Sequence, residues 1–162
     1  MKTQKSLHLE YTEYTSLNSL PKLDQKLLYK AIEASKNAYA KYSNFQVGAA
    51  VLLNNGEIVI GSNQENAAYP SGLCAERVAL FSASSQFSIA KMETLAIYAS
   101  DAMGKEEPVS PCGACRQVMM EYELKQGQSI RLLLLSEKGK VWEFESVKEL
   151  FPFAFVLKPS KK

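Results

Sequence analysis

The sequence is poor in the residue types that mark several whole classes of protein. Its 162 residues include one histidine, one tryptophan and three cysteines. Three cysteines cannot all pair within one chain, and two of them are spaced C-x-x-C, which in a reducing compartment indicates metal or redox chemistry rather than a disulfide framework. The residues after Met1 lack the continuous apolar core of a signal peptide, and no later stretch is long enough to cross a bilayer. We therefore expect a cytoplasmic protein with no membrane partner.

An excess of charge of one sign is also missing. The formal net charge is +2 at pH 7, and 46% of the residues are hydrophobic against 22% charged. Nucleic-acid binders usually gather basic residues on a face or stripe, so we expect no nucleic-acid partner and a merely solvated tail at Lys158, Lys161 and Lys162. The composition is typical of a folded globular chain, and residues 1–162 fit a single domain.

The apolar pattern switches between helical and strand spacing along the chain. Helical spacing runs from Pro21 to about Tyr42. Apolar, β-rich residues 45–53 and a return strand at 57–61 flank Asn54-Asn55-Gly56, a tight-turn sequence that predicts a hairpin. The remaining predicted elements are strands at 94–100, 130–135 and 141–144, and helices at 74–81, 111–124 and 146–151. This order predicts an α/β fold, a three-layer α/β/α sandwich with a mixed central sheet of about five strands.

Residues 1–22 precede this pattern and form an N-terminal extension of unassigned role. Its alternating stretch from Leu7 to Tyr11 is typical of an edge strand or of a subunit contact.

All three cysteines, Cys74, Cys112 and Cys115, lie near predicted helix starts. Residues 112 and 115 are three apart, so their thiols face one side of a helix. Helix N-termini lower thiol pKa values and favour the thiolate that binds metal. A catalytic zinc takes three protein ligands and keeps its fourth position for water. The pattern predicts one Zn²⁺ per subunit, bound by these three cysteines.

Two charged residues follow Cys74 closely. Glu76 is two positions on, so it does not share the helix face of Cys74 and is a poor candidate for a fourth ligand. It still lies within one turn of the metal, where a carboxylate can act as general acid and base. Arg77 is placed to donate hydrogen bonds to cysteine sulfurs and to offset their negative charge. Without the neighbouring cysteine, both would be ordinary residues of a helix surface.

These residues form a known signature. Cys74-Ala75-Glu76 and Pro111-Cys112-Gly113-Ala114-Cys115 match the C-x-E and P-C-x-x-C motifs of zinc nucleoside and nucleobase deaminases. The chain further resembles homotetrameric cytidine deaminases in residues 42–50, 63–70, 110–117 and 149–155. Cysteine rather than histidine at position 74 points to the branch that acts on free nucleosides.

The resemblance, which runs from about Leu23 to Phe155, implies a function. It implies zinc-dependent hydrolysis of cytidine and 2′-deoxycytidine to the uridines and ammonia, a step of pyrimidine salvage. The implied partners are a small pyrimidine nucleoside and other copies of the chain, in a homotetramer with shared active sites.

The resemblance also implies a set of nucleoside-binding residues. They are Asn63 and Glu65 for the ribose 3′ hydroxyl, Phe45 for stacking on the pyrimidine, Val47 for lining the pocket, the Ala75 N–H for the base carbonyl, and Tyr69 and Phe155 from neighbouring subunits. Outside this motif context, Phe45 and Val47 are ordinary core residues of an alternating strand.

Three alternatives stay open at this point. His8 can complete a structural Cys₃His zinc site that is closed to water. Cys112 and Cys115 can instead act as the redox pair of a thiol oxidoreductase. Within the deaminases, the substrate can be a modified cytosine nucleoside such as blasticidin S, although Asn63 and Glu65 favour a ribose with a free 3′ hydroxyl.

Overall fold

The computed structural model describes residues 2–100 and 103–157, so the predicted lysine tail at Lys158, Lys161 and Lys162 lies outside the described residues. The strands are β1 (Thr12–Tyr14), β2 (Gln46–Leu53), β3 (Ile58–Ser62), β4 (Met92–Ser100), β5 (Arg131–Leu135) and β6 (Val141–Phe144). The α-helices are α1 (Lys22–Ser35), α2 (Ala75–Gln86) and α3 (Gly113–Gln126), and short 3₁₀ turns span Leu17–Ser19, Tyr69–Ser71 and Val147–Glu149. Within these described ranges, no helix has the length and apolar character needed to cross a membrane.

The six strands form one mixed sheet in the order β1-β6-β5-β4-β2-β3. β4 and β5 run parallel, because the chain crosses between them through α3, and the other neighbours are antiparallel. The predicted α/β class with a mixed sheet is confirmed, with six strands instead of about five. The additional strand is β1, whose three residues pair with β6 from Thr12 opposite Glu143 to Tyr14 opposite Val141.

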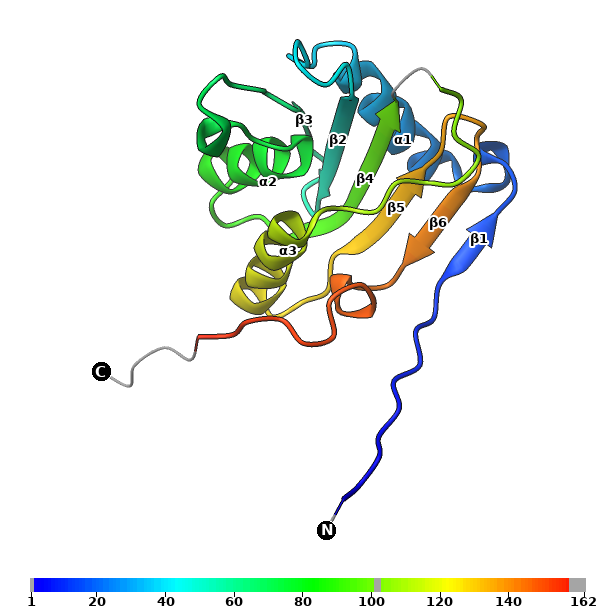
Figure 1. Cartoon of the computed structure of the whole chain (residues 1–162), viewed down its shortest axis with the longest axis vertical. Helices are drawn as coiled ribbons and strands as arrows, with labels where there is room; N and C mark the ends of the chain where they lie inside the picture. Colours follow the sequence, from blue (N-terminus) through cyan, green and yellow to red (C-terminus); the bar gives the residue numbers. More distant parts are fainter. Residues whose placement is uncertain (1, 101–102, 158–162) are drawn as a thin grey trace.

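Helices cover both faces of the sheet, α1 on one side and α2 with α3 on the other (Figure 1). The side chains of β2 contribute to the cores on both sides of the sheet, since successive side chains of a strand point to opposite faces. The side that packs with α2 and α3 receives Val47, Ala49, Val51 and Leu53, whereas the α1 side receives Ala50 and Leu52.

Two glycines let these helices approach the β2–β3 hairpin closely. A Cβ at Gly48 would lie 2.0 Å from the Ala31 carbonyl oxygen of α1. A Cβ at Gly61 would lie 2.5 Å from the Ala79 nitrogen of α2. Real Cβ atoms do not approach this closely, so both helices rest directly on backbone. The start of α2, where the metal-ligand candidate Cys74 lies, is therefore held firmly against the sheet.

Two helix predictions are wrong, and one of the two interpretations of the N-terminal stretch, the edge strand, is excluded. The first helix ends at Ser35 and not near Tyr42, because Tyr39 leaves the helix and its backbone pairs with residues 63 and 65. The stretch from Leu7 to Tyr11 contains no strand, and the edge strand begins one residue later at Thr12. The predicted helix at 146–151 is a single 3₁₀ turn, in which the Ser146 hydroxyl accepts a hydrogen bond from the Lys148 N–H.

Candidate active site

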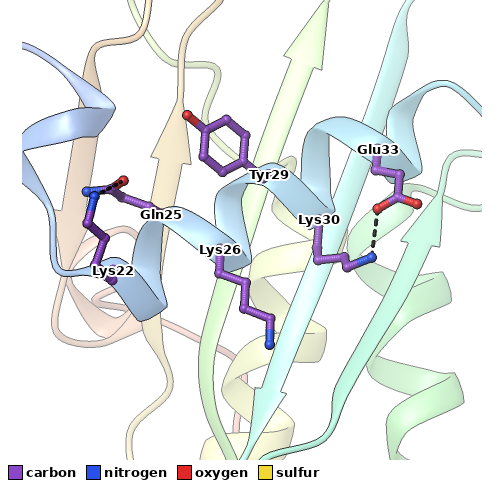
Figure 2. A pocket seen from close by; sticks show the side chains of 6 residues that line it. All are labelled: Lys22, Gln25, Lys26, Tyr29, Lys30 and Glu33. Atoms are coloured by element: carbon purple, nitrogen blue, oxygen red, sulfur yellow. Dashed lines mark hydrogen bonds and ion pairs between the residues drawn. The ribbon is translucent and has the colours of Figure 1, made fainter.

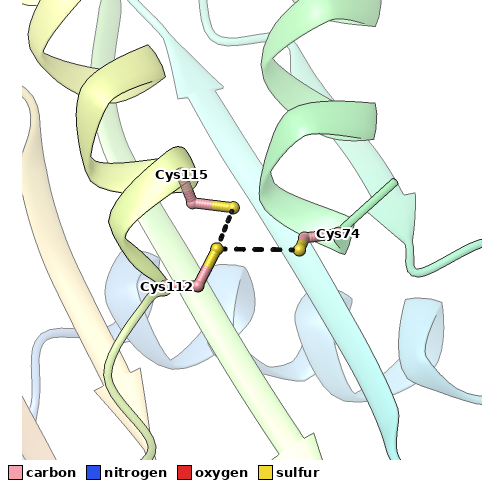
Figure 3. Close-up of side chains that lie close together, drawn as sticks. All are labelled: Cys74, Cys112 and Cys115. Carbon is pink, nitrogen blue, oxygen red and sulfur yellow. Dashed lines mark hydrogen bonds between the residues drawn. The ribbon is translucent and has the colours of Figure 1, made fainter. Parts of the chain in front are cut away.

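The starts of α2 and α3 bring the three cysteines together (Figure 3). Cys74 and Cys112 are the N-cap residues of α2 and α3, and Cys115 lies in the first turn of α3. The Cys112 sulfur lies 3.9 Å from that of Cys74 and 3.5 Å from that of Cys115. All three sulfurs lie within 4.8 Å of one another. Two helix N-termini therefore direct their positive dipole ends toward one cluster of thiols.

The spacing of the sulfurs fits a tetrahedral zinc site. Zinc–sulfur bonds of about 2.3 Å at tetrahedral angles place ligand sulfurs about 3.8 Å apart, close to the separations found here. A disulfide needs a sulfur–sulfur distance of about 2.05 Å, and all three cysteines are free. Three cysteines leave one tetrahedral position for a further ligand. Among the described residues, the group that can hold a metal consists of these three alone and does not include His8.

Arg77 supplies positive charge next to the thiols. Its Nη2 donates to the Cys74 sulfur at 3.7 Å and to the Gly72 carbonyl oxygen at 3.4 Å. Hydrogen bonding from the Cys115 thiol, together with that from Arg77, lowers the pKa of Cys74 to about 5. Hydrogen bonding to Cys74 and burial raise the pKa of Cys115 above its ordinary value. The surroundings of Cys74 therefore favour its thiolate form, which is the form that binds a metal.

Glu76 is buried beside this cluster, with only 5% of its surface exposed. Burial raises the pKa of its carboxyl above the usual range, and negative charge on Cys74 raises it further. Hydrogen bonds from its own backbone N–H and from the Cys115 thiol oppose the shift. A carboxyl group in this environment is able to take up and release a proton, which is the property that general acid–base catalysis requires.

A cavity of about 580 Å³ opens next to the cysteines. This volume is sufficient for a small organic molecule. Its lining includes Cys74 and Arg77 from the metal side, and Phe45, Asn63, Glu65 and Tyr69 among the predicted nucleoside-binding residues. The same wall contains Tyr42, Ser43, Gln64, Asn66, Gly72 and Leu73. The structure thus joins the metal-ligand candidates to a pocket with aromatic, amide and carboxylate groups.

Asn63 joins the end of β3 to the start of β2. Its Oδ1 accepts a hydrogen bond from the Val47 N–H at 2.8 Å, and its Nδ2 donates to the Phe45 carbonyl oxygen at 2.8 Å. A side-chain amide carries two N–H donors, so one remains for another acceptor. The same contacts hold the backbone on both sides of Gln46, at the strand start that carries Phe45 and Val47.

Glu65 holds the loop that precedes β2. Its carboxylate accepts a hydrogen bond from the Tyr42 N–H at 2.7 Å and another from the Ser43 hydroxyl. The bond from the Ser43 side chain, followed by that from the Tyr42 backbone, keeps the pKa of Glu65 below its ordinary value. Glu65 therefore stays ionised at neutral pH and offers a charged acceptor at the cavity wall.

Comparison with known proteins accounts for this arrangement. The family described as "Cytidine and deoxycytidylate deaminase zinc-binding region" matches residues 21–128. The chain belongs to this family. The cytidine deaminase of Halalkalibacterium halodurans is 42% identical over 131 residues, which cover 81% of this chain and 92% of that protein. The cytidine deaminase of Sporosarcina psychrophila is also 42% identical over 131 residues, covering 81% of this chain and 90% of its own length.

Solved structures of the family share the fold. The crystal structure of cytidine deaminase from Burkholderia pseudomallei is 38% identical, covers 80% of this chain and 97% of its own, and superimposes with a TM-score of 0.70. That from Mycobacterium tuberculosis is 32% identical, covers 82% and 96%, and has a TM-score of 0.62. A deaminase with a zinc-binding cysteine cluster is therefore the activity that family and site support together.

Some predicted site residues of this deaminase do not line the cavity. Val47 and Ala75 are buried, with 8% and 0% of their surfaces exposed. Tyr69 lines the rim and is 80% exposed, and Phe155 is 69% exposed and lies outside the cavity lining. The two residues assigned to neighbouring subunits are thus the most exposed of the predicted set.

Tyr42 and Ser43 belong to a motif of the family, but the motif itself indicates no role for them. The structure places both in the cavity lining, where they bind Glu65. Lys105 was also missed, and its ammonium lies 5.3 Å from the centre of the Phe45 ring. Ser43 lies two residues before Phe45 in the same motif, so its position in the sequence indicates that it is close to the pocket. Nothing in the sequence links Lys105 to the Phe45 ring.

A second hollow lies on the outer side of α1, away from the cysteines (Figure 2). It is lined by Lys22, Gln25, Lys26, Tyr29, Lys30 and Glu33. Lys30 pairs with Glu33 at 2.8 Å, an exposed pair one helical turn apart. None of the side chains in this lining belongs to the cysteine cluster, and its lysines follow the helix repeat of a solvated face. We therefore assign the deaminase chemistry to the other side of the sheet.

Proposed function

We propose that the protein is a zinc-dependent hydrolase that converts cytidine and 2′-deoxycytidine to uridine and 2′-deoxyuridine with release of ammonia. It would serve pyrimidine salvage in the cytoplasm. The observation that carries this proposal is the buried Glu76 beside three clustered cysteines, one of which, Cys74, lines a cavity that has Phe45, Asn63 and Glu65 in its wall. Membership of the deaminase family supports the reaction type.

Cys74, Cys112 and Cys115 would hold the zinc, which lowers the pKa of a water molecule so that it attacks at neutral pH. Glu76 would take one proton from a water molecule and deliver it to N3 of the cytosine ring as the water oxygen bonds to C4. Glu76 would then move the remaining proton of the new C4 hydroxyl to the amino group at C4, so that the C4–N bond breaks, a C4 carbonyl forms and ammonia leaves. Arg77 offsets the excess negative charge of three thiolates through its contact with Cys74.

The cavity wall supports a nucleoside rather than a free base. The Phe45 ring offers a face for the pyrimidine. The free N–H of Asn63 and the ionised Glu65 together offer a donor and an acceptor for one sugar hydroxyl. Because only one hydroxyl needs this pair, the 2′ position is left without a required contact, and both ribose and deoxyribose are accepted.

The exposure of Tyr69 and Phe155 supports a shared active site. Aromatic rings that are 80% and 69% exposed present a large apolar surface to solvent in a single chain. Burial against other copies removes this cost and closes the open side of the cavity. We propose a homotetramer in which these two residues complete the pockets of neighbouring subunits.

The test is a substrate panel with zinc-loaded protein. Cytidine, deoxycytidine, cytosine, CMP and blasticidin S are incubated separately, and loss of aminopyrimidine absorbance and release of ammonia are followed. Turnover of the two nucleosides, and loss of turnover in Glu76→Gln, would support the proposal. Turnover of blasticidin S alone would mean that a modified cytosine nucleoside, and not cytidine, is the substrate. No turnover of any compound would refute the deaminase assignment of the pocket.

Zinc content tests the metal separately. We expect one zinc per subunit in the wild-type protein and close to none in Cys112→Ser, since losing one of three protein ligands weakens the site severely. Ser110→Ala, next to the motif, is the matched control and should retain zinc. A zinc-loaded protein whose thiols catalyse dithiothreitol-dependent reduction of insulin would favour the oxidoreductase alternative, because zinc-bound thiolates should not do so.

A further inference from the structure

One glutamine side chain of α3 binds both backbone groups of Phe155. The Gln117 Nε2 donates to the Phe155 carbonyl oxygen at 2.8 Å, and the Phe155 N–H donates to the Gln117 Oε1 at 3.2 Å. Only a side-chain amide combines a donor and an acceptor in this arrangement. The pair of bonds replaces the two that a neighbouring strand would make, so it fixes the orientation of this residue and not merely its position.

Other contacts hold the tail on both sides of this clamp. Arg116 donates from Nη1 to the Leu150 carbonyl oxygen at 2.7 Å, at the start of the tail. Ala154 packs against the core between the sheet and the helices α2 and α3. Its neighbour Phe155 points the other way, with 69% of its surface exposed. The tail, drawn in red in Figure 1, is therefore a bound segment that presents a ring outward.

The clamp is built on the same helix turn as the metal site. Cys115 belongs to the cysteine cluster, and Gln117 follows two residues later. Each helical residue rotates the chain by about 100°, so the two side chains leave α3 on nearly opposite sides. The first turns of α3 thus position a metal-ligand candidate on one side and the aromatic tail on the other. The helix that carries Cys115 of one chain therefore also holds the Phe155 ring that the same chain exposes.

We propose that Gln117 is a positioning residue for substrate binding, which holds the Phe155 ring in the orientation that enters the nucleoside pocket of a second copy. This inference rests on the proposed shared active site. Its physical basis is preorganisation, because a ring on a free tail loses conformational entropy each time that it closes the pocket, whereas a clamped ring has already lost it. Gln117 affects the nucleoside only through Phe155.

The first test compares steady-state kinetics of Gln117→Met and wild type. Methionine keeps the length of the side chain and its helix propensity but removes both hydrogen bonds. We expect KM for cytidine to rise about fivefold or more, with kcat changed less than about twofold, and with zinc content and oligomeric state unchanged. Gln117→Glu keeps the acceptor for the Phe155 N–H, loses the donor, and should raise KM as well. Gln86→Met, an exposed glutamine of α2, is the matched control.

A double mutant separates positioning from general stability. If Gln117 acts through Phe155, Gln117→Met should add nothing to the KM of Phe155→Ala. Phe153→Ala, which removes an even more exposed ring from the same tail, should leave KM unchanged. Additive effects of Gln117→Met and Phe155→Ala would overturn the inference.

Mixed assemblies test whether the tail serves another copy. Subunits with Glu76→Gln have an inactive site and an intact tail. Subunits with Gln117→Met have an intact catalytic site and a tail that is no longer clamped. Assemblies that contain both, purified through two different tags, should recover a low-KM fraction that neither parent shows. Unchanged high KM would overturn the inference, as would a wild-type KM in Gln117→Met itself. Wild-type protein that leaves cytidine intact would instead refute the proposed function on which the inference rests.

Discussion

Two buried carboxylates on opposite faces of the sheet have very different surroundings. Asp24 of α1 is 2% exposed, and Arg131 binds both of its oxygens, one of them at 3.0 Å. Arg131 also binds Glu143 at 2.7 Å, and the Tyr14 hydroxyl donates to Glu143 at 2.7 Å. This network ties α1, β5, β6 and the edge strand β1 together. Every charge in it has a partner, so its geometry is fixed and it has nothing to offer a substrate.

Glu76 of α2 is 5% exposed but belongs to none of the ion pairs found in residues 2–100 and 103–157. Its immediate polar neighbours include thiols, and its pKa is raised chiefly by burial. Arg131 pairs with Asp24, whereas burial raises the pKa of Glu76 and so favours its neutral form. The fold thus uses one buried carboxylate, Asp24, to join elements on one face of the sheet, and holds on the other face the carboxylate that we propose for proton transfer, Glu76.

The largest effect is expected when the carboxylate of Glu76 is replaced by a neutral amide. We expect Glu76→Gln to lower kcat for cytidine by at least about a thousandfold, because the proposed proton carrier is lost. Zinc content should stay the same, and the free energy of unfolding should not fall, since a buried charge without an ion-pair partner is removed. Kinetics, metal analysis and urea denaturation measure the three quantities.

Glu121→Gln is the control for that substitution, because it changes an exposed glutamate of α3 in the same way. It should keep wild-type kcat. Activity of Glu76→Gln within tenfold of wild type would mean that Glu76 is not the proton carrier. The different surroundings of Glu76 and Asp24 would then have no catalytic meaning.

Asp24→Asn tests whether the ion pair of Asp24 with Arg131 stabilises the fold. The free energy of unfolding should drop by about 2–3 kcal/mol, because Arg131 loses one charged partner in a largely buried position but keeps Glu143. The kcat of the folded fraction should be unchanged. Glu33→Gln on the same helix breaks the exposed pair with Lys30 and should alter stability too little to measure. Equal effects of the two substitutions would show that the Asp24 network contributes no more than a surface ion pair.

The sequence carried the information for the cluster but not for these networks. Cys112 and Cys115 are three residues apart, so local spacing predicted that their thiols share a helix face. Cys74 lies 38 positions before Cys112, and its place in the cluster was predicted from the three ligands that a catalytic zinc needs. Asp24 and Arg131 are 107 positions apart, and no local pattern links them. The same holds for the buried Glu123, which accepts hydrogen bonds from Ile130, Ser146 and Val147.

Fold prediction failed where tertiary pairing outweighed local preference. Tyr39 continues the helical spacing of α1, but its N–H donates to the Asn63 carbonyl and its carbonyl accepts from the Glu65 N–H, so the chain leaves the helix earlier. β1 is only three residues long, too short for periodicity to reveal. The roles given to the nucleoside-binding residues came from motif resemblance, and they stay predictions that the kinetic experiments test.

The smallest expected effect concerns Glu65, an ionised carboxylate whose partners are neutral donors. Its pKa lies below the ordinary value of 4.5, chiefly through the hydrogen bond from Ser43. A lowered pKa adds stability that is present above the ordinary value and is lost as the pH falls through the lowered one. Wild type should therefore have a higher Tm than Glu65→Gln at neutral pH, and the difference should vanish in acid. Glu57→Gln, an exposed change in the β2–β3 hairpin, should show no such pH-dependent difference. A Tm gap that persists unchanged into acid would mean that Glu65 holds the loop by shape alone, and Asp24 would remain the clearest case of a charge used for rigidity.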